Sequence, residues 1–177
     1  MKLLLKLLGG LAVLVLLAVA VSFLFPQTYR VERTTVINAR SDVVFAQFGD
    51  LKAWKNWTAW HERDPAMKLS FSESTTNVGA WSAWESKSEG NGKMTLTAVE
   101  PGRKVAYKLE FPDMNMISSG TMDLQPADKG VRVAWVSAGD LGMNPINRWF
   151  GLFLDKMVGT DFERGLARLK TVAESAK

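Results

Sequence analysis

Residues Asn144–Lys177 read NPINRWFGLFLDKMVGTDFERGLARLKTVAESAK, and this C-terminal stretch decides the fold. Its apolar residues recur every three or four positions, which is the spacing of an α-helix. They form two stripes, Ile146, Phe150, Phe153 and Met157, then Phe162, Leu166, Leu169 and Val172. At about 100° per residue, the second stripe is rotated by roughly 140° from the first. The sequence therefore predicts two helical pieces rather than one straight helix.

Gly159 lies between the two stripes and is expected to end the first piece, since glycine favours the position just past a helix. Asn144-Pro145 suits the start of that piece. Thr160-x-x-Glu163 resembles a capping box that would start the second piece. Neither piece can fold alone, so both need a large apolar surface to lie on.

The middle of the chain is expected to supply that surface as a β-sheet. From Met67 to Trp135 apolar and polar residues alternate, most clearly in KVAYKLEF at 104–111. Turn signals separate these runs at short intervals, at Asn91-Gly92, Pro101-Gly102, Pro112-Asp113 and Pro126 to Gly130. Strands this close leave no room for helical crossovers, so we expect an antiparallel meander of about six strands.

Before the meander, residues 30–39 are rich in β-branched side chains and predict a further strand. Two short helices should follow, one capped by Ser41 and one carrying Trp54 and Trp57. The order strand, two helices, six strands and terminal helices predicts an α+β fold. We expect a helix-grip arrangement, in which a curved antiparallel sheet wraps on the C-terminal helix.

The N-terminus carries an uncharged apolar run from Leu7 to Phe25, preceded by Lys2 and Lys6 and closed by Pro26. Its length suits one bilayer crossing, so we predict a transmembrane anchor at residues 1–26 and a helix-grip domain at 27–177. The alternative is a cleaved signal peptide, because Ala18-Val19-Ala20 resembles a peptidase site. Continuation of the apolar run to Phe25 favours the anchor.

The flanking charges bear on topology and on partners. The two N-terminal lysines favour an inside N-terminus, which in a Gram-negative cell predicts a single-pass inner-membrane protein with a periplasmic domain. Without residues 1–25, which hold two lysines and no acid, 20 basic groups face 18 acidic groups. This balance of +2 predicts no nucleic-acid partner.

Composition excludes several kinds of chemistry. The chain has one histidine and no cysteine, so disulfides, thiolate catalysis and the usual zinc sites are excluded, and we predict no metal. No P-loop, dinucleotide fingerprint or G-x-S-x-G elbow occurs, so we predict no cofactor and no serine triad.

Three segments together resemble a known family: RVERTTVINA at 30–39, VVFAQFGDLKAWKNW at 43–57 and GTDFERGLARLK at 159–170. They are similar to the polyketide cyclase/dehydrase-like branch of the START-related (SRPBCC) lipid-binding superfamily. The resemblance covers about residues 30–174. It implies a deep cavity between the curved sheet and the terminal helix that holds a hydrophobic small molecule or lipid. It assigns no catalytic residues.

Two candidate site residues leave alternatives open. His61 is either an exposed or capping histidine or a hydrogen-bond partner at the cavity mouth. Glu85 shares the phase of Trp81, and if that face points inward Glu85 is a carboxylate inside the cavity. Otherwise Trp84 points inward and Glu85 outward, or a bulge changes the phase. The residues we expect to line the cavity are Trp57, Trp60, His61, Trp81, Glu85, Tyr107, Trp135, Phe150, Phe153 and Met157.

These features favour a membrane-anchored module that binds a hydrophobic ligand. The alternative is a polyketide cyclase/dehydratase-type enzyme that uses the same cavity, with His61 or Glu85 moving a proton. A third hypothesis is an interaction domain whose cavity is filled by its own side chains.

Overall fold

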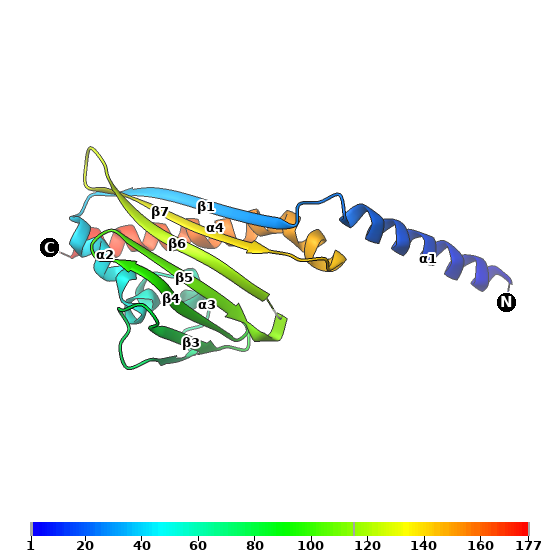
Figure 1. Cartoon of the computed structure of the whole chain (residues 1–177), viewed down its shortest axis with the longest axis horizontal. Helices are drawn as coiled ribbons and strands as arrows, with labels where there is room; N and C mark the ends of the chain where they lie inside the picture. Colours follow the sequence, from blue (N-terminus) through cyan, green and yellow to red (C-terminus); the bar gives the residue numbers. More distant parts are fainter. Residues whose placement is uncertain (1, 115, 177) are drawn as a thin grey trace.

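The computed structural model describes residues 2–114 and 116–176, so Met1 and Lys177, the outer ends of the two predicted segments, lie outside it. An apolar helix leads into one curved sheet that grips a long C-terminal helix (Figure 1). The elements, in chain order, are α1 (Lys2–Ser22), β1 (Thr28–Ile37), α2 (Ser41–Gly49), η1 (Leu51–Asn56), α3 (Ala59–Arg63), β2 (Lys68–Phe71), β3 (Trp81–Glu85), β4 (Gly92–Glu100), β5 (Lys104–Phe111), η2 (Pro112–Met114), β6 (Met116–Pro126), β7 (Val131–Asp140) and α4 (Pro145–Ser175).

The sheet has seven antiparallel strands in the order β1-β7-β6-β5-β4-β3-β2. The predicted six-strand meander is confirmed as β2 to β7, and β1 joins it by pairing with β7. Inward residues alternate with outward ones along each strand, so the concave face is apolar. The α+β helix-grip fold expected from the sequence is confirmed.

The prediction of two C-terminal helical pieces is wrong, because α4 is one continuous helix of 31 residues. Its start is as expected, with the Asn144 side chain accepting a hydrogen bond from the backbone N–H of Ile146 at 2.9 Å. Thr160 lies inside this helix, and its hydroxyl donates to the carbonyl of Lys156, one turn back. A straight helix can bury only one of the two apolar stripes. It buries Phe162, Leu166 and Leu169 of the second, and leaves the first exposed.

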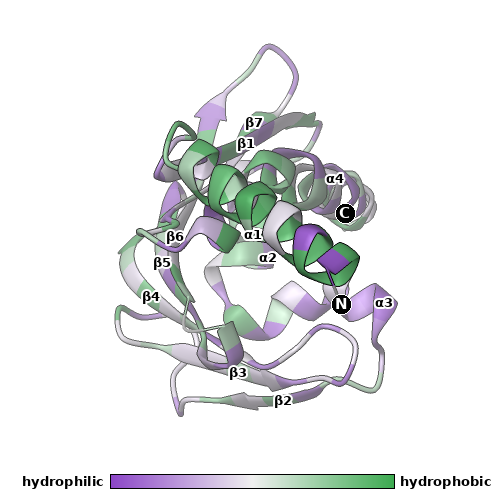
Figure 2. Ribbon diagram, turned by 90° about the vertical axis from the view of Figure 1, so that its right-hand side faces the viewer, coloured by the Kyte–Doolittle hydropathy of each residue, from purple (hydrophilic) through white to green (hydrophobic). Residues whose placement is uncertain are grey.

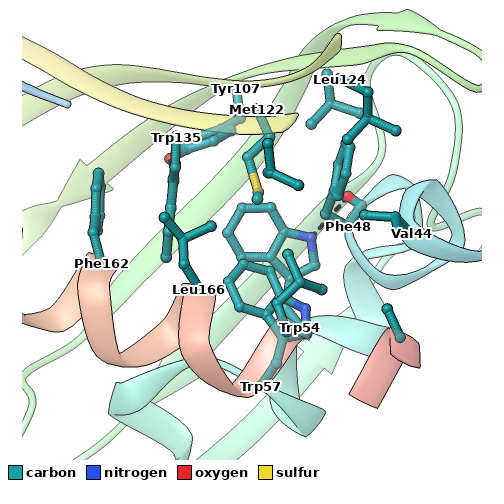
Figure 3. Packing of buried hydrophobic residues seen from close by; sticks show 14 of the residues in the cluster. Val44, Phe48, Trp54, Trp57, Tyr107, Met122, Leu124, Trp135, Phe162 and Leu166 are labelled. Atoms are coloured by element: carbon teal, nitrogen blue, oxygen red, sulfur yellow. Dashed lines mark hydrogen bonds between the residues drawn. The ribbon is translucent and has the colours of Figure 1, made fainter. Parts of the chain in front are cut away.

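The apolar core fills the end of the grip next to α2 (Figure 3). Trp54 of η1 and Trp57, which directly follows η1, pack there between β7 and α4. The Trp135 ring stacks on Phe162 with centroids 3.8 Å apart. Figure 3 shows the indole nitrogen of Trp54 bonded to the carbonyl of Phe48, at 2.9 Å. The Trp57 indole donates to the Gln47 carbonyl at 2.8 Å. Each buried indole N–H therefore has an acceptor, as burial requires.

At the opposite end of the grip, α1 projects away from the sheet (Figure 1). It is an almost uniformly apolar helix (Figure 2). Of the helices in residues 2–114 and 116–176, it alone is long and apolar enough to cross a membrane. A signal sequence near an N-terminus has the same character. The C-terminal end of α1 contacts the beginning of α4.

Candidate ligand cavity

A cavity of about 200 Å³ lies between the sheet, α3 and the first half of α4. Its walls come from the start of β1 (Tyr29), the start of β6 (Met116, Ser118) and the end of β7 (Ser137). Leu154, Val158 and Phe162 line it from α4, one helical turn apart. The cavity therefore occupies the end of the grip from which α1 leaves. The apolar core around Trp54, Trp57 and Trp135, here called the tryptophan core, fills the other end.

Aromatic rings on the cavity wall lie flat over glycines of the neighbouring strand. Tyr29 faces Gly139 across β1 and β7, Tyr107 faces Gly120 across β5 and β6, and Trp84 faces Gly92 across β3 and β4. A Cβ atom built on any of these glycines would collide with the opposing ring. Glycine is thus needed for close approach rather than for an unusual backbone conformation. These three rings form one continuous side of the cavity, here called the aromatic floor.

Few polar groups reach this cavity, and Tyr107 carries one of them. Its hydroxyl accepts a hydrogen bond from the Trp135 indole nitrogen at 2.7 Å. Burial raises the pKa of Tyr107, and the Trp135 bond only partly opposes that effect. The hydroxyl is therefore neutral at physiological pH. Among residues 2–114 and 116–176 its proton has no acceptor, so it is free to donate to a ligand.

His61 belongs to α3 and lies in the wall of the cavity. Its Nδ1 is 2.5 Å from the hydroxyl of Thr58, which is fully buried. Burial is the main cause that lowers the pKa of His61, and the charge of Lys55 lowers it further. The imidazole is therefore neutral at pH 7. Its other ring nitrogen bonds to no described residue, which leaves it available to a bound molecule.

Ion pairs hold α3 against α4 beside His61. Arg63 bonds to Glu89 through Nε at 2.9 Å and also bonds to Asp161 of α4. These two hydrogen bonds raise the pKa of Arg63, with that to Glu89 the larger cause. Asp161 in turn accepts from the Trp60 indole nitrogen at 3.0 Å. The network fixes Trp60 and Glu89, both of which line the cavity.

Of the ten residues predicted to line the cavity, the structure brings together Trp60, His61 and Tyr107. Trp57 and Trp135 lie in the tryptophan core instead and reach the cavity only through other side chains. Their rings fill the space between sheet and helix, so the core ends where the cavity begins.

Trp81 and Glu85 point to the outer face of β3, away from the cavity. Trp81 lies under the ammonium of Lys93 at 4.9 Å, and Glu85 is exposed. The alternative in which Trp84 points inward and Glu85 outward is therefore correct, because Trp84 lies over Gly92 and lines the cavity.

Phe150, Phe153 and Met157 also lie outside the cavity. They face outward on α4 and are 41%, 58% and 51% exposed. Sequence reasoning missed Leu154 and Val158, which replace them. These two form an i, i+4 series with Phe162 and Leu166, and this spacing was a usable signal. Nothing local pointed to Tyr29, Ser118 or Ser137.

Comparison with known proteins identifies the family. Residues 28–174 match the family described as "Polyketide cyclase / dehydrase and lipid transport". The chain belongs to this family. The resemblance seen in the sequence is thereby confirmed. No curated protein matches the chain.

Solved structures share the fold at low sequence identity. The di-domain ARO/CYC StfQ, from the steffimycin biosynthetic pathway, superposes with a TM-score of 0.64 at 16% identity, covering 84% of this chain and 51% of that one. A Thermobifida fusca protein gives 0.64 at 19% identity, with 84% and 95% covered. MLL2253 from Mesorhizobium loti gives 0.58 at 18% identity, with 85% and 98% covered. These similarities concern the fold.

Proposed function

We propose that this protein is a membrane-anchored module that binds a hydrophobic small molecule or lipid in its cavity. The observation that carries the proposal is an apolar cavity with an aromatic floor and a few polar groups, at the end of the fold where the apolar helix leaves. Pockets of this composition bind apolar ligands and orient them through their few polar groups. An interaction domain filled by its own side chains would have no such space.

The size of the cavity bears on the ligand. At about 200 Å³ it exceeds the apolar cavity of roughly 150 Å³ that accepts benzene. It is smaller than the roughly 300–1,000 Å³ of most ligand pockets. It suits one or two rings or part of an acyl chain. The flexible side chains of Met67, Met94 and Met116 line it, and their movement would admit more.

Helix α1 supports the membrane part of the proposal. Its 21 residues span about 32 Å at 1.5 Å per residue, close to the thickness of a hydrocarbon core. With Lys2 and Lys6 inside, the binding domain would face the periplasm in a Gram-negative cell. Uncleaved, this helix keeps the cavity beside the lipid from which a hydrophobic ligand comes.

A matched pair of serine substitutions tests binding. Ser118 on β6 lines the cavity, and its neighbour Ser119 is exposed on the other face of the same strand. Ser118→Leu should fill the cavity and abolish ligand binding, whereas Ser119→Leu should bind as the native chain does. Native mass spectrometry of the full chain, extracted from its own membrane, measures the bound fraction. Equal ligand occupancy in both variants would exclude this cavity.

A second function is favoured by one observation, the neutral His61 held by Thr58 in the cavity wall. Such an imidazole can take up a proton from a bound polyketide-like substrate, as a cyclase or dehydratase requires. An enzyme would hold different molecules before and after His61→Gln, differing in mass by one water or in chromatographic retention. The same bound molecule in both proteins would support binding alone.

A further inference from the structure

The outward face of α4 changes character along its length. In the first half it is apolar: Ile146, Trp149, Phe150, Phe153 and Met157, here called the outer stripe, are 76%, 39%, 41%, 58% and 51% exposed. In the second half the exposed positions are mostly polar, with Thr160, Glu163, Arg164, Thr171 and Ser175, and the one apolar residue among them is the small Ala167. A helix on a water-exposed surface shows polar residues there throughout.

The outer stripe lies opposite the face that α4 packs on the sheet. At about 100° per residue its members fall within an arc of roughly 100°. Phe162 and Leu166, both buried, lie on the other side of the helix. The first half of α4 is therefore apolar on both sides, and only one side is covered by the fold.

Helix α1 ends at the outer stripe. The Trp149 indole donates to the carbonyl of Ala18 at 3.1 Å, and the Trp149 ring meets that of Phe25 edge-on at 4.7 Å. The buried Arg148 donates to the carbonyls of Phe23 and Phe25 at 3.3 and 3.4 Å. A carbonyl in the last turns of α1 and two carbonyls just beyond its end are thus bound by α4, which fixes the stripe beside the apolar helix.

We propose that the outer stripe lies in the lipid–water interface of the bilayer that α1 spans. This inference rests on the membrane anchor in the proposed function. Helices with one strongly apolar face bind at this depth, and tryptophan is enriched there. The polar outward face after Met157 then marks where α4 leaves the lipid for water.

With the outer stripe in the interface, the cavity lies next to the membrane. Phe153 and Met157 of the stripe directly precede Leu154 and Val158, which line the cavity. On the opposite wall, cavity-lining Met116 is followed by Ile117, which is 60% exposed. Apolar surface therefore adjoins the cavity on two sides, and a ligand dissolved in lipid would enter without crossing water.

The absence of cysteine in the sequence allows a direct test on the full chain. Single-cysteine variants Phe153→Cys and Met157→Cys carry a nitroxide label, with Thr160→Cys and Arg164→Cys as controls on the same outward face. The labelled proteins are reconstituted in vesicles of phosphatidylethanolamine and phosphatidylglycerol. Collisions of the nitroxide with oxygen, which partitions into lipid, are compared with those of a water-soluble nickel chelate.

Oxygen collisions should exceed nickel collisions at 153 and 157, and the order should reverse at 160 and 164. Nickel-dominated collisions at all four positions in protein that floats with the vesicles would overturn this inference and leave the anchor intact. Spin–spin broadening at 153 and 157 would also overturn it, because a second copy of the chain would then cover the stripe. Protein that does not float would overturn both the anchor and the stripe's placement.

Discussion

The guanidinium of Arg33 lies over the α4 backbone at Gly159, in the space that any side chain at 159 would occupy. From there Arg33 donates through Nε to Glu163 at 2.6 Å and through Nη1 to Asp155 at 3.0 Å. The bond from Arg33 lowers the pKa of Asp155. Arg33 of β1 therefore explains why residue 159 is a glycine, and the helix continues through this position instead of ending there.

This relationship predicts that the effect of Gly159→Ala depends on Arg33. Alanine is favoured over glycine inside a helix by about 1 kcal/mol. In an Arg33→Ala background, Gly159→Ala should raise the free energy of unfolding by about that amount. In the native background the new methyl group displaces the guanidinium from its carboxylates, so the gain should shrink or vanish.

Chemical denaturation of the four proteins of this cycle, as full chains in detergent, measures the difference. An equal gain in both backgrounds would show that Arg33 does not occupy the space over Gly159.

The aromatic floor predicts that Gly120→Ala is costly although it adds one methyl group. The new side chain would collide with the Tyr107 ring and separate its hydroxyl from the Trp135 indole. Overpacking of this kind costs about 1–3 kcal/mol of unfolding free energy. Ser119→Ala on the outer face of the same strand is the control and should change stability little. A loss no larger in Gly120→Ala than in this control would mean that the ring has room to move.

Two phenylalanines on α4 should differ sharply in their contribution to stability. Phe162 is 2% exposed and stacks on Trp135, so Phe162→Ala should cost about 3–5 kcal/mol. Phe153 is 58% exposed, so Phe153→Ala should change the free energy of unfolding by about 0.5 kcal/mol or less in detergent. Urea titration monitored by circular dichroism compares them. A large loss for Phe153→Ala would place that ring in a protein interior.

The sequence predicted the fold well because its elements are encoded locally. Alternation at 104–111 and the cap at Asn144 both act within a few residues, and both are found as expected. Gly159 misled because its role depends on Arg33, which is far away in the chain but adjacent in space.

The cavity was harder to predict for the same reason. Phe153 and Leu154 lie on helix faces about 100° apart, and only the sheet decides which one lines the cavity. Trp81 and Trp84 posed a similar choice on β3, which Gly92 of the next strand decides by accepting the Trp84 ring. The family resemblance therefore implied that a cavity exists, but residue spacing did not determine which side chains form its wall.

The membrane topology can be tested with a reporter. If α1 stays attached and the binding domain faces the periplasm, alkaline phosphatase fused after Lys177 should be active, because this enzyme needs the oxidising periplasm to form its disulfides. A cytoplasmic reporter fused at the same position is the matched control and should be inactive. The opposite pattern would place the domain in the cytoplasm. A mature N-terminus near Val21 would show that α1 is a cleaved signal sequence.

His61 predicts how stability depends on pH. Its pKa in the fold is below the ordinary value, chiefly because it is buried. As pH falls through about 6.5, the unfolded chain binds a proton at this histidine and the folded chain does not. The melting temperature of the full chain in detergent should therefore fall as the pH is lowered from about 7.5 to 5.5, a window above the ordinary carboxylate pKa values.

His61 is the only histidine in the sequence, so His61→Gln should remove most of this dependence. Glutamine retains a polar partner for Thr58, which separates the loss of titration from the loss of a hydrogen bond. An unchanged pH dependence in His61→Gln would mean that His61 is protonated equally in the folded and unfolded chain, and that burial does not lower its pKa.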